Sequence, residues 1–304
     1  MNIDFSSGPK QVNQFNLSRK HELIDENIRL EASGAPIPGW IELSPVDLCN
    51  RTCAFCPRAD PEIAPNRKLY MSMELCESLT RQLEEFGFEG TVVLGGYGEP
   101  LLHPDIIQLV RTLSAVCNTE LVTNGDRLSS ECARSLVDAG IGKVLVSLYD
   151  GPEQMEELQA VLKEAGVPPE HFILRPRWQD AVEDYGLILT NRAGTVTVGN
   201  QSELRLKEKC FYPHYMMMVD WNGEVFPCPQ DWHRNTPMGN ISKESVMDVW
   251  LSEQYREFRV HLAAASRCHH PCNHCNARGV LHGQGHAGAW TKFYESGKEG
   301  PELS

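Results

Sequence analysis

Short apolar runs alternate with amphipathic segments along the middle of the chain. The apolar runs have the length of buried strands and lie at residues 40–43, 91–94, 119–122, 143–148 and 172–175. The segments between them carry apolar residues at helical spacing and lie at residues 73–86, 105–115, 129–139 and 153–165. Because repeated strand–helix units form parallel sheets with right-handed crossovers, the pattern predicts an α/β fold built on a partial (β/α)6, TIM-like barrel.

Polar residues and glycines lie at the ends of these predicted strands. In chain order they are Cys49, the run Gly95-Gly96-Tyr97-Gly98-Glu99-Pro100, Asn124, Ser147 and residues 175–177. Barrel enzymes carry their chemistry at the carboxyl ends of their strands. We therefore expect these turns to form the functional site.

Three cysteines follow the first predicted strand closely. Cys49, Cys53 and Cys56 lie in the run C-N-R-T-C-A-F-C. Three thiolates can hold three irons of a 4Fe–4S cluster and leave the fourth iron open to another ligand. Structural zinc usually takes four ligands from two spaced pairs. The triplet therefore favours a cluster over zinc.

A second set of four cysteines lies beyond residue 200. Cys210 and Cys228 flank the apolar stretch 216–219 and an Asn-Gly pair, which predicts a β-hairpin that brings the two thiols together. Cys272 and Cys275 form a C-x2-C pair. Four thiols satisfy either a tetrahedral zinc or a fully ligated iron–sulfur cluster, and the residues alone leave both open.

The first cysteine set and the glycine-rich turn resemble the radical S-adenosylmethionine (SAM) superfamily. The resemblance implies that SAM chelates the open iron and is cleaved to a 5'-deoxyadenosyl radical, which abstracts hydrogen from unactivated C–H bonds. It further implies that SAM is bound by Phe55, Gly98, Glu99, Asn124 and Ser147.

The hairpin, the run Met238-Gly239-Asn240-Ile241 and the C-x2-C pair resemble the SPASM and twitch auxiliary-cluster domains of that superfamily. The resemblance implies a second 4Fe–4S cluster on Cys210, Cys228, Cys272 and Cys275. It divides the chain into an N-terminal extension, a radical SAM partial barrel, an auxiliary domain and a tail, at residues 1–36, 37–195, 196–286 and 287–304. We expect the glycine- and histidine-rich run 282–286 to be a flexible or lid segment.

Cys268 determines which reaction we expect. The resemblance extends to dehydrogenases and epimerases of aminoglycoside biosynthesis, and the dehydrogenase pattern does not require this cysteine. Cys268 lies four residues before Cys272, so it is a hydrogen-atom donor, an auxiliary ligand or an inert buried thiol. We predict epimerisation of an aminoglycoside-type sugar with Cys268 as donor. The alternatives are oxidation of an aminocyclitol alcohol to a ketone, peptide modification, and a non-catalytic iron–sulfur scaffold.

Four more residues are predicted near the substrate. Arg192 matches an active-site arginine of the dehydrogenases, although a pKa above about 12 makes arginine a poor base. Its alternative role is a salt bridge that closes the barrel. Gln230, Asp231 and Trp232 follow Cys228, and we expect Asp231 to hold an amino or hydroxyl group and Trp232 to stack on a sugar face.

The net charge of −13, from 41 acidic and 28 basic residues, repels nucleic acid and attracts cations. It suits a cationic sugar, and reductive cleavage of SAM implies an electron donor such as flavodoxin or ferredoxin. The chain has no apolar run of the roughly 18 residues that a membrane span needs and no charged-then-apolar leader. With 11 cysteines assigned to metal binding rather than disulfides, we expect a cytoplasmic enzyme.

Overall fold

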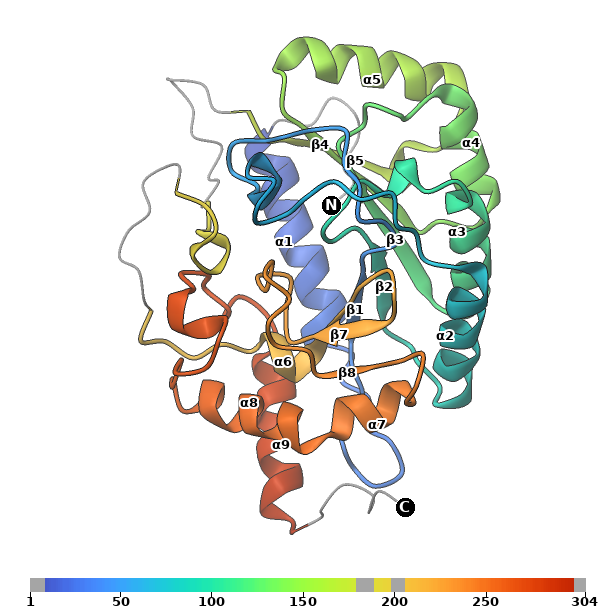
Figure 1. Cartoon of the computed structure of the whole chain (residues 1–304). Coiled ribbons are helices and arrows are strands. Elements are labelled where there is room, and N and C mark those ends of the chain that lie inside the picture. The colour runs from blue at the N-terminus through green and yellow to red at the C-terminus, as the bar shows by residue number, and fades with distance from the viewer. Residues whose placement is uncertain (1–8, 179–188, 198–205, 298–304) are drawn as a thin grey trace.

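The computed structural model describes residues 9–178, 189–197 and 206–297. Over these residues the strands form one sheet in the order β5-β4-β3-β2-β1-β6-β7-β8 (Figure 1). The strands are β1 Trp40–Leu43, β2 Thr91–Leu94, β3 Asn118–Thr123, β4 Lys143–Leu148, β5 Phe172–Pro176, β6 Met216–Val219, β7 Glu224–Phe226 and β8 Gly239–Asn240. The six strands β1 to β6 pair in parallel, while β7 and β8 are antiparallel. The predicted α/β partial barrel is confirmed.

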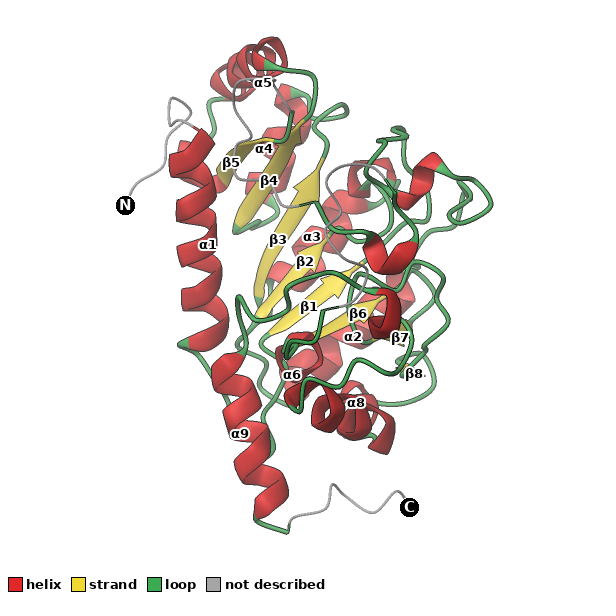
Figure 2. Ribbon diagram, turned by 90° about the vertical axis from the view of Figure 1, so that its left-hand side faces the viewer, coloured by secondary structure: helices red, strands yellow, loops and turns green. Residues whose placement is uncertain are grey.

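Four helices cover the outer face of the sheet (Figure 2). They are α2 Met73–Glu85, α3 Ile106–Ser114, α4 Ser130–Asp138 and α5 Pro152–Ala165. Because strand side chains alternate between faces, Ile41, Leu43 and Val146 point toward these helices and are fully buried. The Ser72 hydroxyl accepts a hydrogen bond from the Leu75 N–H, so it caps α2.

Helix α1 (Pro9–Asp25) covers the opposite, inner face of the sheet (Figure 2). Val12 packs against Leu145 of β4 and Ile173 of β5, whose neighbours along each strand point to the outer helices. The part of the predicted N-terminal extension that the structure describes is therefore a layer of the fold.

Charged residues attach α1 to the inner face as well. The Arg19 guanidinium pairs with the Glu120 carboxylate of β3, whose side chain is 1% exposed. The Lys20 ammonium lies 4.4 Å from the centroid of the Trp40 ring. Burial lowers the pKa of Lys20, against the opposing charges of Glu42 and Glu120. The inner face is thus polar, and α1 removes much of it from water.

The predicted hairpin after Cys210 is confirmed, but its first strand has a second role. Met218 of β6 lies opposite Phe226 of β7, and Gly223 in the turn has a φ of 84°. On its other side β6 pairs in parallel with β1, with Met218 opposite Glu42. The sheet therefore runs without a break from the barrel into the predicted auxiliary domain.

Four helices complete the C-terminal part: α6 Tyr212–Tyr215, α7 Val246–Leu251, α8 Glu253–Ala263 and α9 Gln284–Glu295. Arg259 of α8 is 1% exposed, and its guanidinium carbon lies 4.1 Å from the Trp250 ring centroid and 3.7 Å from that of Trp290. Its N–H groups donate to the carbonyls of Pro213 and Trp250. This stack joins three of the four helices.

The expectation of a flexible or lid segment at residues 282–286 is wrong. His286 is fully buried, Trp290 is 1% exposed, and both lie on α9. Gly283 precedes this helix with a φ of 89°, and its N–H donates to the Asp25 carboxylate at the end of α1. The glycines therefore allow a tight helix start and close packing.

Among the described residues, no helix is both long and apolar enough to span a membrane.

The Arg19–Glu120 pair gives a test of the α1 layer. Arg19→Met leaves a buried carboxylate unpaired, so we expect the free energy of unfolding to fall by about 3 kcal/mol. Guanidinium chloride unfolding followed by circular dichroism measures this. The matched control is Arg29→Met, whose pair with Glu89 has side chains 55% and 60% exposed, and which we expect to change stability by less than about 1 kcal/mol. Equal effects of the two variants would contradict the buried role of Arg19.

Candidate cluster and cofactor site

The first three thiols lie in the loop that follows β1. A turn between the last two cysteines is closed by the Cys56 N–H, which donates to the Cys53 carbonyl at 2.9 Å. Burial, followed by the charges of Cys56 and Cys49, raises the pKa of Cys53 to about 11. Burial also raises the pKa of Cys49. The thiols thus influence one another and are partly shielded from water.

The four later thiols also converge. Burial, followed by the charges of Cys272, Cys275 and Cys210, raises the pKa of Cys228 well above its ordinary value. The Ala277 N–H donates to the Cys275 sulfur at 3.3 Å. Hydrogen bonds from backbone N–H groups to sulfur are among the features that tune iron–sulfur clusters.

The spacing of the sulfurs tests which metal group fits. A zinc ion with Zn–S distances of about 2.3 Å holds any two of its thiolates within about 4.6 Å of each other. Among residues 9–178, 189–197 and 206–297, two groups of three potential ligands have all their ligand atoms within 4.8 Å of one another. One group is His261, Cys268 and His269, and the other is His21, Asp25 and His282. Neither predicted cysteine set is that compact. Neither set therefore meets the spacing of a zinc site, which leaves a larger group such as a four-iron cluster.

Asp47 organises the loop around the first thiols. Its carboxylate accepts hydrogen bonds from Arg58 Nη2 at 2.5 Å, Arg67 Nε at 2.6 Å and Arg234 Nη2 at 3.1 Å. The side chains of Asp47 and Arg58 are each 1% exposed. Arg58 Nε also donates to the Tyr97 carbonyl at 2.6 Å. The loop is therefore tied to the glycine-rich turn and to the segment after Cys228.

The glycine-rich turn packs directly on the loop that leads to Cys49. A Cβ atom on Gly98 would lie 2.0 Å from the Val46 carbonyl oxygen, so only glycine fits. The Glu99 carboxylate accepts from the Thr123 hydroxyl at 2.7 Å and the Asn124 N–H at 2.9 Å. Burial raises the pKa of Glu99. Glu99 thus fixes the ends of β2 and β3, and its role toward SAM stays a prediction.

The remaining predicted SAM-binding residues surround this turn. Asn124 Nδ2 lies 4.0 Å from the Cys49 sulfur and donates to Asn50 Oδ1 at 3.0 Å. The Phe55 ring centroid lies 5.4 Å from that of Tyr149. Ser147 on the inner face of β4 accepts from Arg175 Nη2 at 2.8 Å. These positions are compatible with the predicted roles, which stay predictions.

Two charged residues lie on the inner face: Glu42, which was not predicted as a site residue, and Arg175, which belongs to the turn at residues 175–177 that was expected to contribute. Glu42 lies in the middle of β1, and burial raises its pKa against the opposing charges of Lys20 and Arg192. Burial, followed by the charge of Arg177, lowers the pKa of Arg175 to about 9. Arg175 Nε is buried and has no hydrogen-bond partner among the described residues. A charged residue inside an otherwise apolar strand was the signal in the sequence.

Arg192 lies between the inner face and the later thiols. Burial raises the pKa of both Glu42 and Cys275, and the charge of Arg192 opposes both shifts. Arg192 and Ala193 have φ values of 45° and 54°, which are strained for residues other than glycine. Asn191 holds this turn against the Cys272–Cys275 segment, because its Nδ2 donates to the His274 carbonyl at 2.8 Å. The alternative role predicted for Arg192, a salt bridge that closes the barrel, is absent from the described contacts.

Residues 230–232 make contacts within the protein, and their expected contacts with substrate stay a prediction. Asp231 is fully buried, and its carboxylate accepts from the N–H of Thr236 at 2.9 Å, so it fixes a turn. Trp232 is 5% exposed and packs edge-to-face on Tyr97 with ring centroids 4.8 Å apart. Gln230 Oε1 accepts from the Thr190 hydroxyl at 3.2 Å.

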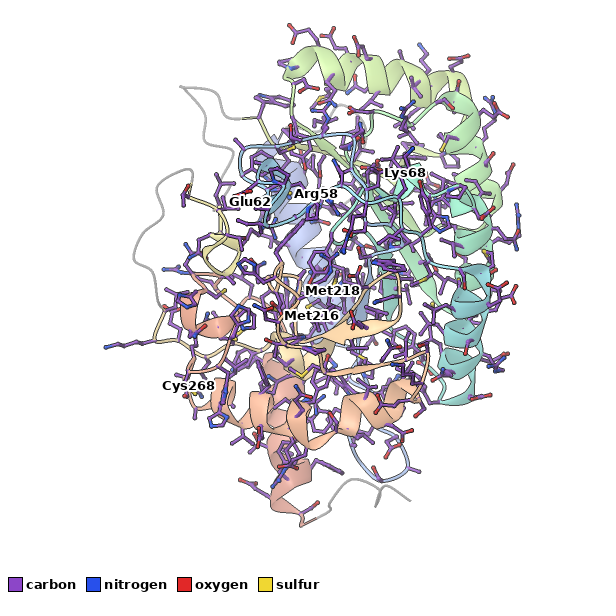
Figure 3. All side chains as sticks on the ribbon, in the orientation of Figure 1. Arg58, Glu62, Lys68, Met216, Met218 and Cys268 are labelled. Atoms are coloured by element: carbon purple, nitrogen blue, oxygen red, sulfur yellow. The ribbon has the colours of Figure 1, made fainter. Side chains whose placement is uncertain are left out.

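Cys268 is exposed and accepts a hydrogen bond from the Ser266 hydroxyl at 3.4 Å. In Figure 3 it lies at the margin of the C-terminal part, while Arg58, Met216 and Met218 lie in the interior. The donor role needs a thiol that faces the substrate across from SAM, and for Cys268 that role stays a prediction.

Comparisons with known families match both cysteine sets. The radical SAM superfamily matches residues 43–173, and the SPASM iron–sulfur cluster-binding domain matches residues 210–276. The first range holds the cysteine triplet and the glycine-rich turn, and the second holds the four later thiols. The first domain thus binds a 4Fe–4S cluster and SAM, and the second binds further iron–sulfur.

Among individual proteins, the S-adenosyl-L-methionine-dependent 2-deoxy-scyllo-inosamine dehydrogenase of Niallia circulans is 28% identical over 243 residues, which are 78% of this chain and 92% of that enzyme. The GTP 3',8-cyclase of Saccharophagus degradans is 38% identical over 118 residues, which are 38% of this chain and 34% of the cyclase. The likeness to the cyclase is thus limited to about a third of each protein.

Solved structures agree with the fold. The crystal structure of BtrN in complex with AdoMet and 2-DOIA has a TM-score of 0.68 at 24% identity and covers 83% of this chain and 98% of that chain. Native anSMEcpe with bound AdoMet has a TM-score of 0.51 at 15% identity, covering 84% and 96%.

The Asp47 network predicts which variant loses the first cluster. In Asp47→Ala the buried Arg58 loses its carboxylate, so we expect the cysteine loop to open and the iron of the reconstituted protein to fall by roughly half, one of two four-iron clusters. Iron and sulfide analysis measures this. Asp150→Ala is the control, because Asp150 is 57% exposed and its partner Arg51 keeps Asp126. Full iron in Asp47→Ala would contradict the role of the network.

Proposed function

We propose that this radical SAM enzyme, with its C-terminal SPASM domain, oxidises a secondary alcohol of an aminocyclitol to a ketone. The observation that carries the proposal is the likeness to the inosamine dehydrogenase over 92% of that enzyme's length. The comparisons support this reaction better than the epimerisation that the sequence led us to expect.

The described geometry supports an oxidation that ends near the second thiol set. Arg192 is within electrostatic reach of both Glu42 and Cys275. Tyr212 likewise lies near Glu42 and near Cys210, Cys228 and Cys275, whose charges raise its pKa after burial. A substrate on the inner face beside Glu42 is therefore close to the auxiliary thiols, as a transfer of one electron requires.

Oxidation of a carbinol carbon to a ketone removes a hydrogen atom, a proton and an electron. When bound, the first cluster and SAM supply the radical that takes the hydrogen atom, and the second cluster supplies an acceptor for the electron. The proton must be accepted by a side chain of this protein.

We infer that Glu42 accepts this proton. Its carboxylate accepts a hydrogen bond from the Gly96 N–H in the turn after β2, which fixes its position on the inner face. Because burial raises the pKa of Glu42, the carboxylate is a stronger base than an exposed one. Arg175, with its free Nε, is placed to donate to a substrate hydroxyl. Arg192 helps to keep Glu42 ionised.

The reaction is tested with 2-deoxy-scyllo-inosamine, SAM and dithionite under anaerobic conditions in deuterium oxide. We expect 5'-deoxyadenosine and an amino ketone in equal amounts, measured by mass spectrometry. Cys53→Ala is the control and should form neither, because it lacks a cluster ligand. The same ketone should form in Cys268→Ala. An inverted carbon that carries solvent deuterium, lost in Cys268→Ala, would instead establish the epimerase.

Glu42→Gln separates catalysis from stability. Because the pKa of Glu42 is raised in the fold, its contribution to stability is present below the unfolded pKa of about 4.3 and is lost as pH rises through the folded value. We therefore expect the free energy of unfolding of the variant to exceed that of the wild type at pH 8, and the difference in free energy to shrink toward pH 4.5. We also expect the variant to oxidise substrate at least about 100-fold more slowly. Unfolding at several pH values and single-turnover kinetics check both. A slow variant that is also less stable at pH 8 would indicate a structural role.

A further inference from the structure

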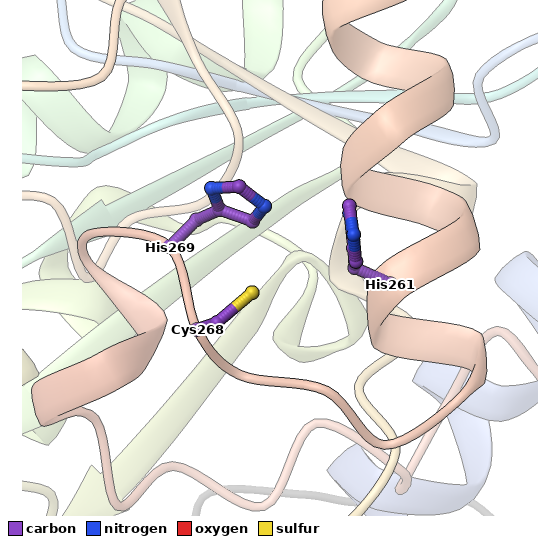
Figure 4. A group of neighbouring side chains, drawn as sticks. All are labelled: His261, Cys268 and His269. Atoms are coloured by element: carbon purple, nitrogen blue, oxygen red, sulfur yellow. The ribbon is translucent and has the colours of Figure 1, made fainter.

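Cys268 belongs to a compact group of metal-ligand side chains that contains none of the seven predicted cluster cysteines. The ligand atoms of His261, Cys268 and His269 all lie within 4.8 Å of one another. Their side chains turn toward a common space at the end of α8 (Figure 4). The two imidazole ring centroids are 4.7 Å apart with the rings edge-to-face.

The backbone brings these residues together at the end of α8. Ala265 has a φ of 59°, and the Ser266 N–H donates to the His261 carbonyl at 2.8 Å. This turn reverses the chain, so that residues 268 and 269 return alongside the last turn of the helix. Phe258 of α8 lies against the His269 ring, with centroids 5.6 Å apart, and limits its position.

One imidazole is already oriented as a ligand. His261 Nδ1 lies 2.9 Å from the Glu257 carbonyl oxygen. Because a carbonyl oxygen only accepts, Nδ1 carries the proton, and the neutral ring presents its Nε2 lone pair. Histidine ligands of metals almost always use their second nitrogen in this way. His261 therefore meets a requirement of a metal ligand without a metal to impose it.

From this geometry we propose that His261, Cys268 and His269 bind one zinc ion, with water as the fourth ligand. One thiolate and two imidazoles are typical zinc donors, with Zn–S of about 2.3 Å and Zn–N of about 2.0 Å. The site is separate from the two clusters and does not depend on the proposed oxidation.

The zinc connects two segments that carry auxiliary thiols. The Leu262 carbonyl, next to His261, accepts from the Cys210 N–H at 3.3 Å. Cys268 leads within four residues to Cys272. A metal at the end of α8 therefore restrains the Cys210 and Cys272 segments relative to each other.

Equilibrium dialysis against zinc-65 chloride, followed by zinc and iron analysis, tests the site in protein that already contains both clusters and SAM. We expect one zinc per chain with unchanged iron. X-ray absorption at the zinc edge should give one sulfur and two nitrogen neighbours. Cys268→Ser and His269→Gln should each weaken zinc binding at least about tenfold, because each removes one of three protein ligands.

Two variants serve as matched controls. His171→Gln removes another histidine whose Nδ1 contacts a backbone carbonyl, that of Ile141 at 2.9 Å. Cys132→Ser removes a thiol on α4. Both should bind zinc as the wild type does. The proposal is overturned if wild-type protein binds no zinc, if zinc enters only as iron leaves, or if Cys268→Ser and His269→Gln bind zinc as tightly as the controls. These readouts are independent of ketone formation.

Discussion

The buried Asp47 carboxylate is the contact on which the geometry of the site depends. The loop after β1 has little regular secondary structure, so strand ladders do not fix its shape. Instead, Asp47 pairs with Arg58 inside the loop, Arg67 beyond it and Arg234 in the segment after Cys228. A buried charge is tolerated only when it is paired, so each arginine is held in one place. Because Arg234 also pairs with Asp220, the first thiols and the hairpin are positioned by one network.

The inner face of the sheet owes its chemistry to the helix that covers it. Glu42, Glu120 and Arg175 place charges where many barrels place apolar side chains. Helix α1 excludes water from this face and neutralises Glu120 with Arg19. Glu42 has no such ion pair among the described residues, and desolvation raises its pKa while the charge of Lys20 on α1 opposes the shift.

Local patterns predicted the strands, the outer helices and both cysteine sets, because these signals lie within a few consecutive residues. The missed features depend on distant contacts. Helix α1 was not predicted, since its inward side mixes Arg19 and Lys20 with apolar residues such as Val12 and Ile24 and has no continuous apolar stripe. Residues 282–286 looked flexible because of their glycines, yet Gly283 has a φ of 89° and a Cβ there would lie 2.2 Å from Tyr215 Cδ1, so the turn and its packing require glycine. The role of Asp47 could not be predicted either, because it depends on Arg234, which is distant in sequence and contacts Asp47 only in the folded protein.

The two kinds of thiol arrangement also explain how a fifth cysteine is tolerated beside a four-cysteine cluster site. The auxiliary ligands come from segments more than 40 residues apart and surround a wide space, whereas Cys268 shares a narrow one with two imidazoles. Thiolate prefers soft metals and iron–sulfur clusters, so a free Cys268 four residues from Cys272 would compete for iron during assembly. The histidines place that thiol in a site suited to a single small ion. In the proposed zinc site Cys268 is bound to one ion, which leaves the four predicted auxiliary cysteines for the cluster, although all five carry the same donor atom.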